Sequence, residues 1–168
     1  HSLPNLSLDT TVEIPGEVSK LRSGGGVLMG GSDTGVPFKI NGPVGKIIES
    51  QRPNLSWQPL SGAESYRVEI YDDDFRKVAS SPELKTNKWT VDRPLSRGKV
   101  YQWQVIAIKD GEEIKSPVRP APEAKFMIVD GAHYSEIERA RRSGGNSHLI
   151  LGIVYANAGM LDEAQREL

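Results

Sequence analysis

The most constraining feature of the chain is a series of short segments in which apolar and polar residues alternate with a period of two. This period is typical of strands with one buried face and one solvated face. Four such segments lie at 55–58, 65–71, 100–107 and 124–129, and a shorter one lies at 89–91. We therefore predict a mainly β fold. The residues expected to point inward are Leu55, Trp57, Tyr66, Val68, Ile70, Trp89, Val91, Tyr101, Trp103, Val105, Ala107, Ala124, Phe126 and Ile128.

Turn-forming residues separate these segments. Asp110-Gly111 lies between two strand-like runs and is typical of a β-hairpin. Short strands at near-regular spacing favour an antiparallel sandwich over a parallel sheet. The other turn signals are Pro59-Leu60-Ser61-Gly62, Asp72-Asp73-Asp74, Ser81-Pro82 and Arg97-Gly98.

The spacing between Leu95 and Tyr101 indicates which type of sandwich the chain forms. Arg97 and Gly98 turn the chain between these two residues. A Tyr at the start of a late strand, with its hydroxyl bonded to the upstream backbone, is the tyrosine corner of Greek-key sandwiches. Over about residues 42–131 the chain resembles the fibronectin type III-like fold. The segments that carry the resemblance are Pro53-x-Leu55-x-Trp57, Gly62-Ala63-x-x-Tyr66-x-Val68-x-Ile70-Tyr71, and Leu95 to Tyr101-x-Trp103-x-Val105-x-Ala107.

The resemblance implies a fibronectin type III-like antiparallel β-sandwich, which we assign to residues 36–131. The sequence departs from animal modules by placing Trp103 on the late strand and by lacking an Arg-Gly-Asp motif, so integrin binding is not carried over. Two segments, Arg52-Pro53-x-Leu55-x-Trp57 and Tyr101-x-Trp103-Gln104-Val105, resemble segments of bacterial extracytoplasmic sandwich domains. That similarity implies a periplasmic or cell-envelope location.

The last part of the chain, 132–168, changes from strand to helix pattern. Residues 136–142 are mostly good helix formers, and Ser135 with Glu138 matches a capping box, although a helix start near Gly131 is the alternative. We expect a second helix at about 147–158 and a third from Leu161.

A motif in this tail resembles the tetratricopeptide repeat. It reads Leu151-Gly152-x-x-Tyr155-x-x-x-Gly159-x-x-Asp162-Glu163-Ala164-x-x-x-Leu168. Gly152 and Ala164 are small where the two helices would cross, and Leu151, Tyr155 and Leu168 would fill the groove between them. The match is cut off inside its second helix, and stable solenoids need several stacked repeats. Because the chain also starts at His1 without Met, we expect it to be a piece of a longer protein that continues into a repeat array.

Residues 1–35 are rich in glycine, and we expect them to form a flexible leader. Within it we expect one helical turn near 17–21 and a short strand at 27–29. The glycine run at 24–35 lacks the Gly-Lys-Ser/Thr ending of a phosphate-binding loop.

The residue types needed for chemistry are scarce. The chain has no Cys, which excludes disulfides and thiolate metal sites, and its 3 His show neither metal-ligand nor catalytic-triad spacing. The Asp72-Asp73-Asp74 run lacks the glycine and distal glutamate of a calcium loop, so a solvated turn is favoured. We predict no catalytic, cofactor-binding or metal-binding residues, no cofactor, and no enzyme activity.

The charge balance also limits the partners. With 21 Lys+Arg against 22 Asp+Glu the net charge is -1, so nothing electrostatic favours nucleic acid or an anionic membrane. The sequence has no apolar run of about 18 residues and no signal-peptide pattern. We expect a protein or peptide partner, no nucleic acid, and no membrane contact within the chain.

Two functions remain open. The first is a non-enzymatic protein-interaction or spacer module of a bacterial extracytoplasmic, membrane-anchored protein of a sensor or anti-sigma-like kind. The alternative is a carbohydrate-binding accessory domain of a larger enzyme. Trp57, Trp89 and Trp103 would suit a sugar-stacking platform, but their strand parity favours the core.

The candidate contact residues lie in two places. Tyr71 and Phe75 flank the Asp run, and Ile150 and Val154 lie on the second tail helix. With the repeat incomplete, we also expect that the apolar tail can associate with a second copy.

Overall fold

The structure is a computed structural model that describes residues 36–143 and 148–168. The expected leader at 1–35, with its helical turn at 17–21 and its strand at 27–29, lies outside the described residues. Within the described part, no helix has the length and apolar character needed to cross a bilayer.

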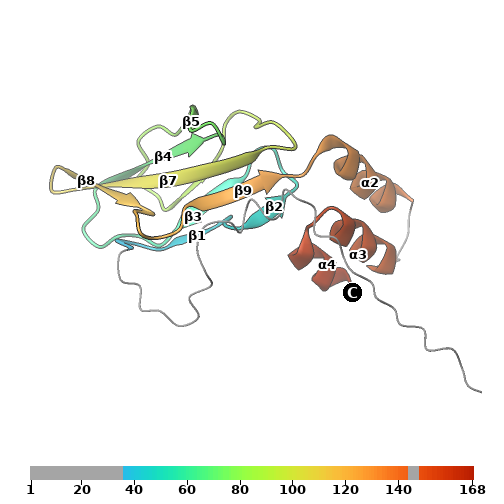
Figure 1. The fold of residues 1–168 in the computed structure, drawn as a ribbon. Helices are drawn as coiled ribbons and strands as arrows, with labels where there is room; N and C mark the ends of the chain where they lie inside the picture. Colours follow the sequence, from blue (N-terminus) through green and yellow to red (C-terminus); the bar gives the residue numbers. More distant parts are fainter. Residues whose placement is uncertain (1–35, 144–147) are drawn as a thin grey trace, which may run out of the picture.

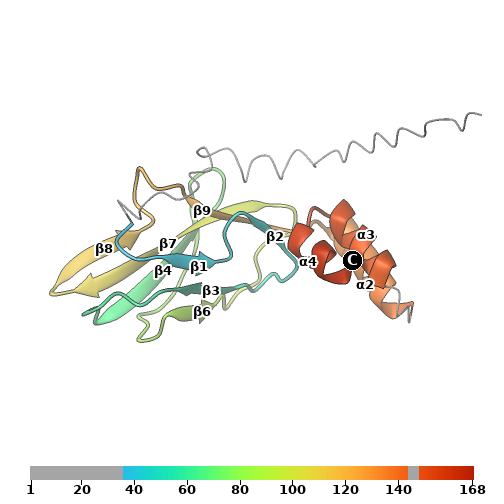
Figure 2. The same cartoon turned by 90° about the horizontal axis from the view of Figure 1, so that it is seen from below.

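Two β-sheets face each other, as Figures 1 and 2 show. The smaller sheet has the strand order β1-β3-β6 and the larger has the order β2-β9-β7-β4-β5, with β8 also paired to β7. The chain crosses between the sheets from β3 to β4, from β5 to β6 and from β6 to β7, which makes a Greek-key sandwich. The strands are β1 (Ile40–Gly42), β2 (Lys46–Ile48), β3 (Asn54–Trp57), β4 (Ser65–Tyr71), β5 (Lys77–Ser80), β6 (Lys88–Thr90), β7 (Val100–Lys109), β8 (Glu112–Ser116) and β9 (Ala124–Ile128).

The sandwich core contains every residue predicted to point inward, so the strand register read from the alternation is confirmed. Aromatic rings fill much of the space between the sheets: Trp57 and Tyr66 lie 5.4 Å apart between ring centroids. The buried members of this core are Phe38, Leu55, Trp57, Tyr66, Val68, Ile70, Trp89, Val91, Leu95, Tyr101, Trp103, Val105, Ala107, Ala124, Phe126 and Ile128.

The predicted tyrosine corner is present. The hydroxyl of Tyr101, at the start of β7, accepts a hydrogen bond from the Ser96 backbone N–H at 2.9 Å. Gly98 has a φ of +76° in the turn between them, a conformation that favours glycine. The Asp110-Gly111 hairpin is also confirmed, because both residues have positive φ and they join β7 to β8.

The expectation of a fully antiparallel sandwich was wrong at one edge. Strand β2 pairs with β9 in parallel, with Ile47 opposite Met127. The cause lies in the short link between β1 and β2. Pro43 has no N–H to give to a ladder, and Gly45 has a φ of +67°, so the chain leaves the smaller sheet there and continues along the edge of the larger one.

Three helices follow the sandwich: α2 (Gly131–Arg142), α3 (His148–Asn157) and α4 (Leu161–Glu167). Helix α2 begins directly after β9, with Asp130 as its N-cap; the Asp130 carboxylate accepts the His133 N–H at 2.8 Å. The Ser135 capping box was therefore wrong, and the alternative start near Gly131 holds. Since Ser135 lies inside the helix, its hydroxyl donates to the Gly131 carbonyl instead.

The helices pack against one end of the sandwich, beside β2 and β9 (Figures 1 and 2). They form a second core, called the junction core here. Met127 and Val129 alternate with the inward residues of β9, yet both are buried, because the helices cover that face of the strand. The buried residues of the junction core are Ile47, Met127, Val129, Ile137, Tyr155, Ala158, Met160 and Ala164.

Candidate functional site

The three tryptophans do not form an exposed platform. Trp57, Trp89 and Trp103 are each at most 8% exposed, and all three belong to the sandwich core. The indole Nε1 of Trp103 donates to the Pro43 carbonyl at 3.0 Å. The three tryptophans are therefore not available to stack against a sugar, as the carbohydrate-binding alternative would require.

Helix α3 carries an exposed apolar face. Its sequence, HLILGIVYAN, contains no Asp, Glu, Lys or Arg. Leu149, Ile150 and Ile153 are 50–61% exposed along one side, while Gly152 and Tyr155 are buried on the other. A helix that is apolar on all sides is normally covered on all sides. The outer face of α3 is thus a candidate contact surface.

The two candidate tail residues lie in different environments. Ile150 is on the exposed face. Val154 is half-buried and packs against the junction core. Ile150 therefore belongs to the candidate contact surface, whereas Val154 mainly supports it from beneath.

Helix α4 lies very close to α3. A Cβ added to Gly152 would come within 2.7 Å of the Leu168 side chain and 3.4 Å of the Ala164 carbonyl oxygen. The predicted close crossing at Gly152 and Ala164 is confirmed. Leu168 was expected to fill the groove with Tyr155; it lies close to Gly152, but it is 73% exposed.

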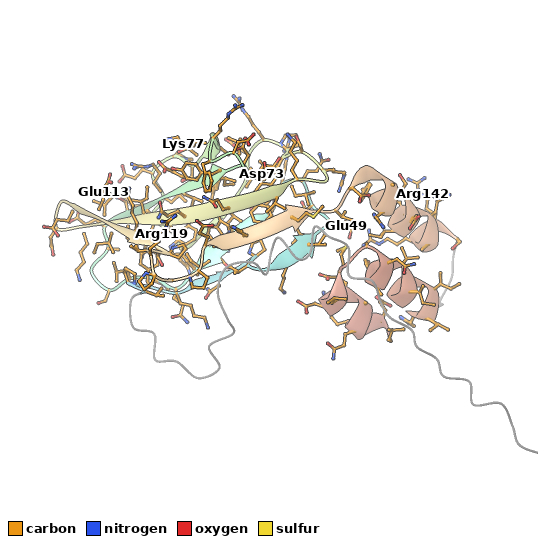
Figure 3. All side chains as sticks on the ribbon, in the orientation of Figure 1. Glu49, Asp73, Lys77, Glu113, Arg119 and Arg142 are labelled. Carbon is orange, nitrogen blue, oxygen red and sulfur yellow. The ribbon has the colours of Figure 1, made fainter. Side chains whose placement is uncertain are left out.

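Polar contacts fix the helices to the sandwich. Arg141 on α2 pairs with the Glu49 carboxylate, which follows β2, and its Nη2 donates to the Tyr155 hydroxyl at 2.7 Å. A second carboxylate, Glu138, lies 3.1 Å from Arg141. The hydrogen bond to Glu49 raises the pKa of Arg141, against the effect of burial. Figure 3 shows Glu49 at the end of the sandwich that faces the helices.

A second cationic contact lies beside the first. The Arg97 guanidinium is 3.7 Å from the centroid of the Tyr134 ring and donates to the Glu49 carbonyl at 2.8 Å. Arg97 thus joins the turn before β7 to both α2 and the segment after β2. The position of α3 relative to the sandwich follows from these contacts and from the junction core.

The outer face of the larger sheet contains an open cavity of about 380 Å³. It lies between strands β4 and β7 and the proline-rich loop that joins β8 to β9. Figure 3 shows Arg119, from this loop, at the part of the sandwich away from the helices. The residues that line the cavity are Tyr71, Gln102, Trp103, Gln104, Pro117, Val118, Arg119, Ala121 and Glu123.

Tyr71 forms one wall of this cavity and has a fixed hydroxyl. That hydroxyl donates to Glu69 at 2.5 Å, and the hydrogen bond raises the pKa of Tyr71 to about 12. Burial on its own would raise the pKa of Glu69. The hydrogen bond from Tyr71 and the charges of Lys77 and Arg67 outweigh burial, so the pKa of Glu69 is lowered. Glu69 is therefore ionised and holds Tyr71 in place.

The turn after β4 carries the other predicted contact residue. Phe75 is 67% exposed and has a φ of +60°. The side-chain oxygens of Asp72, Asp73 and Asp74 lie within 4.8 Å of one another. Asp72 Oδ1 accepts the backbone N–H groups of Asp74 and Arg76, each at 2.9 Å. The acidic run therefore organises its own turn, as expected for Asp at such positions.

Comparison with known proteins finds matches among solved structures, each at low identity. No family model matches the chain, and no curated protein sequence matches it. A crystal structure of an Fn3-like protein from Clostridium thermocellum is similar, with 20% identity and a TM-score of 0.40, covering 56% of this chain and 95% of that one.

Two human domains are similar as well. The solution structure of a fourth FNIII domain has 18% identity and a TM-score of 0.37, covering 63% of this chain and 89% of that one. The fn3 domain of collagen alpha-1(XX) has 18% identity and a TM-score of 0.32, covering 55% of this chain and 95% of that one. The strand order and the tyrosine corner define this sandwich as fibronectin type III-like.

Proposed function

We propose that this chain is a non-enzymatic protein-interaction module in which a rigid sandwich presents helices α3 and α4 to a protein partner. The observation that carries the proposal is the exposed apolar face of α3, formed by Leu149, Ile150 and Ile153. When a partner covers such a face, the burial of apolar area stabilises the complex by roughly 25 cal/mol per Å².

The surroundings of this face support a protein as the partner. Helix α3 contains no Asp, Glu, Lys or Arg, and the chain is close to neutral. Electrostatic attraction to nucleic acid or anionic lipid is therefore weak. An amphipathic helix laid against α3 would match an apolar face of this kind. The close α3–α4 pair at Gly152 and Ala164 supports a tetratricopeptide-like unit.

The parent protein is part of the same proposal. We place the module in a bacterial extracytoplasmic, membrane-anchored protein of a sensor or anti-sigma-like kind, on the strength of the sequence resemblances of the sandwich and the tail. Fusing alkaline phosphatase to the parent protein at the sandwich tests the location, since this enzyme is active only where its disulfides form. An inactive fusion that is stably expressed would contradict an extracytoplasmic location.

Site-specific photo-crosslinking tests the partner. The parent protein would carry a photo-reactive amino acid at Leu149 or at Ile153, in its native cell. The matched control is Arg142, which lies on α2 and is 81% exposed at its side chain. We expect both α3 positions, and not position 142, to crosslink to the same second protein, and Leu149→Ser to abolish the crosslink at 153. Crosslinks only within one chain, or only between two copies, would contradict the proposal.

A further inference from the structure

The cavity on the outer face of the larger sheet is built on a restrained loop. Three prolines, at 117, 120 and 122, limit the backbone freedom of this loop. The Gln104 side chain donates to the Pro117 carbonyl at 3.1 Å, and the Ser116 hydroxyl donates to the Phe38 carbonyl at 2.5 Å. A loop that is already ordered loses little conformational entropy when it binds a ligand.

The walls of the cavity offer a fixed aromatic ring beside aliphatic surface. The bond from Tyr71 to Glu69 orients the Tyr71 ring, and Lys77 lies 3.4 Å from the same carboxylate. Pro117 and Val118 contribute the aliphatic part of the lining. A ligand with an apolar face can pack against these groups.

The cavity also offers unused hydrogen-bonding groups. Within the described residues, the Gln102 amide and the Arg119 guanidinium form no hydrogen bond or ion pair with another protein group. Gln102 both donates and accepts, and Arg119 only donates. The Glu123 carboxylate, 3.1 Å from Lys125, is half-buried and accepts. The lining thus holds one guanidinium, Arg119, and one carboxylate, Glu123, and a ligand that carries several hydroxyls can accept from the first and donate to the second.

We propose that this cavity binds a ring of a neutral carbohydrate. A pyranose has apolar C–H faces, which suit Tyr71 and Val118, and a rim of hydroxyls, each of which donates and accepts, as the amide, guanidinium and carboxylate require. The volume of about 380 Å³ lies within the range of small-molecule sites, about 300–1,000 Å³.

A peptide strand does not suit this place. Strand β7 is paired on both of its edges, with β4 on one side and with β8 and β9 on the other, so no free edge is present to extend the sheet. The proposed sugar site is separate from the α3 face and does not depend on the proposed partner protein.

An NMR titration tests the proposal. The uniformly ¹⁵N-labelled protein would be titrated separately with three neutral probes: cellotetraose, maltotetraose and tetra-N-acetylchitotetraose. We expect at least one probe to shift the amide signals of residues 102–104 and 117–123 in a saturable way. Gln102→Ala should weaken binding about tenfold, because it removes a hydrogen-bonding group that no protein contact uses.

The control variants make the outcome decisive. Phe75→Ala removes an exposed aromatic ring outside the cavity and should leave the affinity unchanged, as should Leu149→Ser on α3. Tyr71→Phe retains the ring but loses the bond that orients it, so it should bind more weakly, whereas Tyr71→Ala should not bind. The proposal is overturned if no probe gives saturable shifts, if the shifts map elsewhere, or if Gln102→Ala binds as tightly as the wild type in a folded state shown by its spectrum.

Discussion

The sandwich core and the junction core are formed by side chains of different size. The sandwich core joins two sheets through large side chains, among them Trp57, Trp103 and Phe126, all of them almost completely buried. The junction core is smaller, and small residues such as Ala158 and Ala164 let its helices approach closely. Side-chain volume therefore defines the first core, whereas close backbone approach defines the second.

The two regions also differ in how polar groups secure them. In the sandwich, the Tyr101 hydroxyl is tied to the backbone of Ser96, five residues away in the chain. At the junction, Arg141 reaches Glu49 across 92 residues. The first contact closes a local turn, and the second joins two parts of the chain that are far apart in sequence. This difference indicates that the junction depends on the sandwich being formed.

The largest expected effect is in the sandwich core. Trp103→Ala should lower the free energy of unfolding by roughly 3–5 kcal/mol, because it removes a large buried ring and leaves a cavity. Urea denaturation followed by circular dichroism measures the change. The control is Phe75→Ala, whose exposed ring should cost at most about 0.5 kcal/mol. A small loss for Trp103→Ala would mean that the register of β7 is wrong.

The next effect tests whether the two cores unfold together. Ile137 on α2 is fully buried in the junction core, and Ile137→Ala should cost roughly 2–4 kcal/mol. All three tryptophans lie in the sandwich core, so their fluorescence reports on the sandwich alone. If the cores are coupled, Ile137→Ala shifts the fluorescence transition and the helical circular dichroism transition equally. Two separate transitions would show that the tail unfolds independently of the sandwich.

Tyr101→Phe tests the local polar contact with a smaller change. It retains the ring in the core and removes only the hydroxyl, so the expected loss is about 1 kcal/mol. Urea denaturation measures this loss. The matched control is Tyr134→Phe: Tyr134 contacts Arg97 through its ring face, which phenylalanine retains. An unchanged stability for Tyr101→Phe would show that the tyrosine corner contributes nothing to this sandwich.

The contrast between the two cores explains why the sequence predicted the sandwich core correctly. Alternation such as Tyr66, Val68 and Ile70 is a local pattern, so the inward residues and their strands were predicted correctly. Strands β5 and β8 were not placed by alternation, because they lie at sheet edges and most of their residues are exposed on both faces.

The junction and the cavity required information from distant parts of the chain. Met127 and Val129 alternate with the inward residues of β9, and only helices that follow later in the sequence make them buried. Tyr71 was singled out as a contact residue, but the other polar residues that line the cavity, Gln102, Gln104, Arg119 and Glu123, were not. The one available signal was the run of prolines after β8, which marks a restrained loop but does not say which strands it lies beside.

The smallest expected effect compares one carboxylate from each region as the pH falls. The pKa of Glu69, in the sandwich, is lowered because the hydrogen bond from Tyr71 and the nearby cations outweigh burial. The pKa of Asp130, at the start of α2, is lowered because hydrogen bonds from His133 outweigh burial. Each group therefore contributes stability above its ordinary pKa, 4.5 for Glu69 and 3.8 for Asp130, and this stability is lost as the pH falls through the folded-state pKa.

Glu69→Gln and Asp130→Asn remove the charges and largely keep the shapes, and asparagine remains a good N-cap. At neutral pH each variant should be less stable than the wild type by about 1 kcal/mol, because Asp130 is partly exposed, and because Glu69, which is buried, keeps a hydrogen-bonding side chain when it becomes Gln. This difference should shrink as the pH falls below about 4. Urea denaturation at a series of pH values measures it, with fluorescence for the sandwich and circular dichroism for the helices. If Asp130→Asn destabilises the helices without shifting the fluorescence transition, the two cores are not coupled. A difference that stays constant down to the most acidic pH would contradict the lowered pKa values.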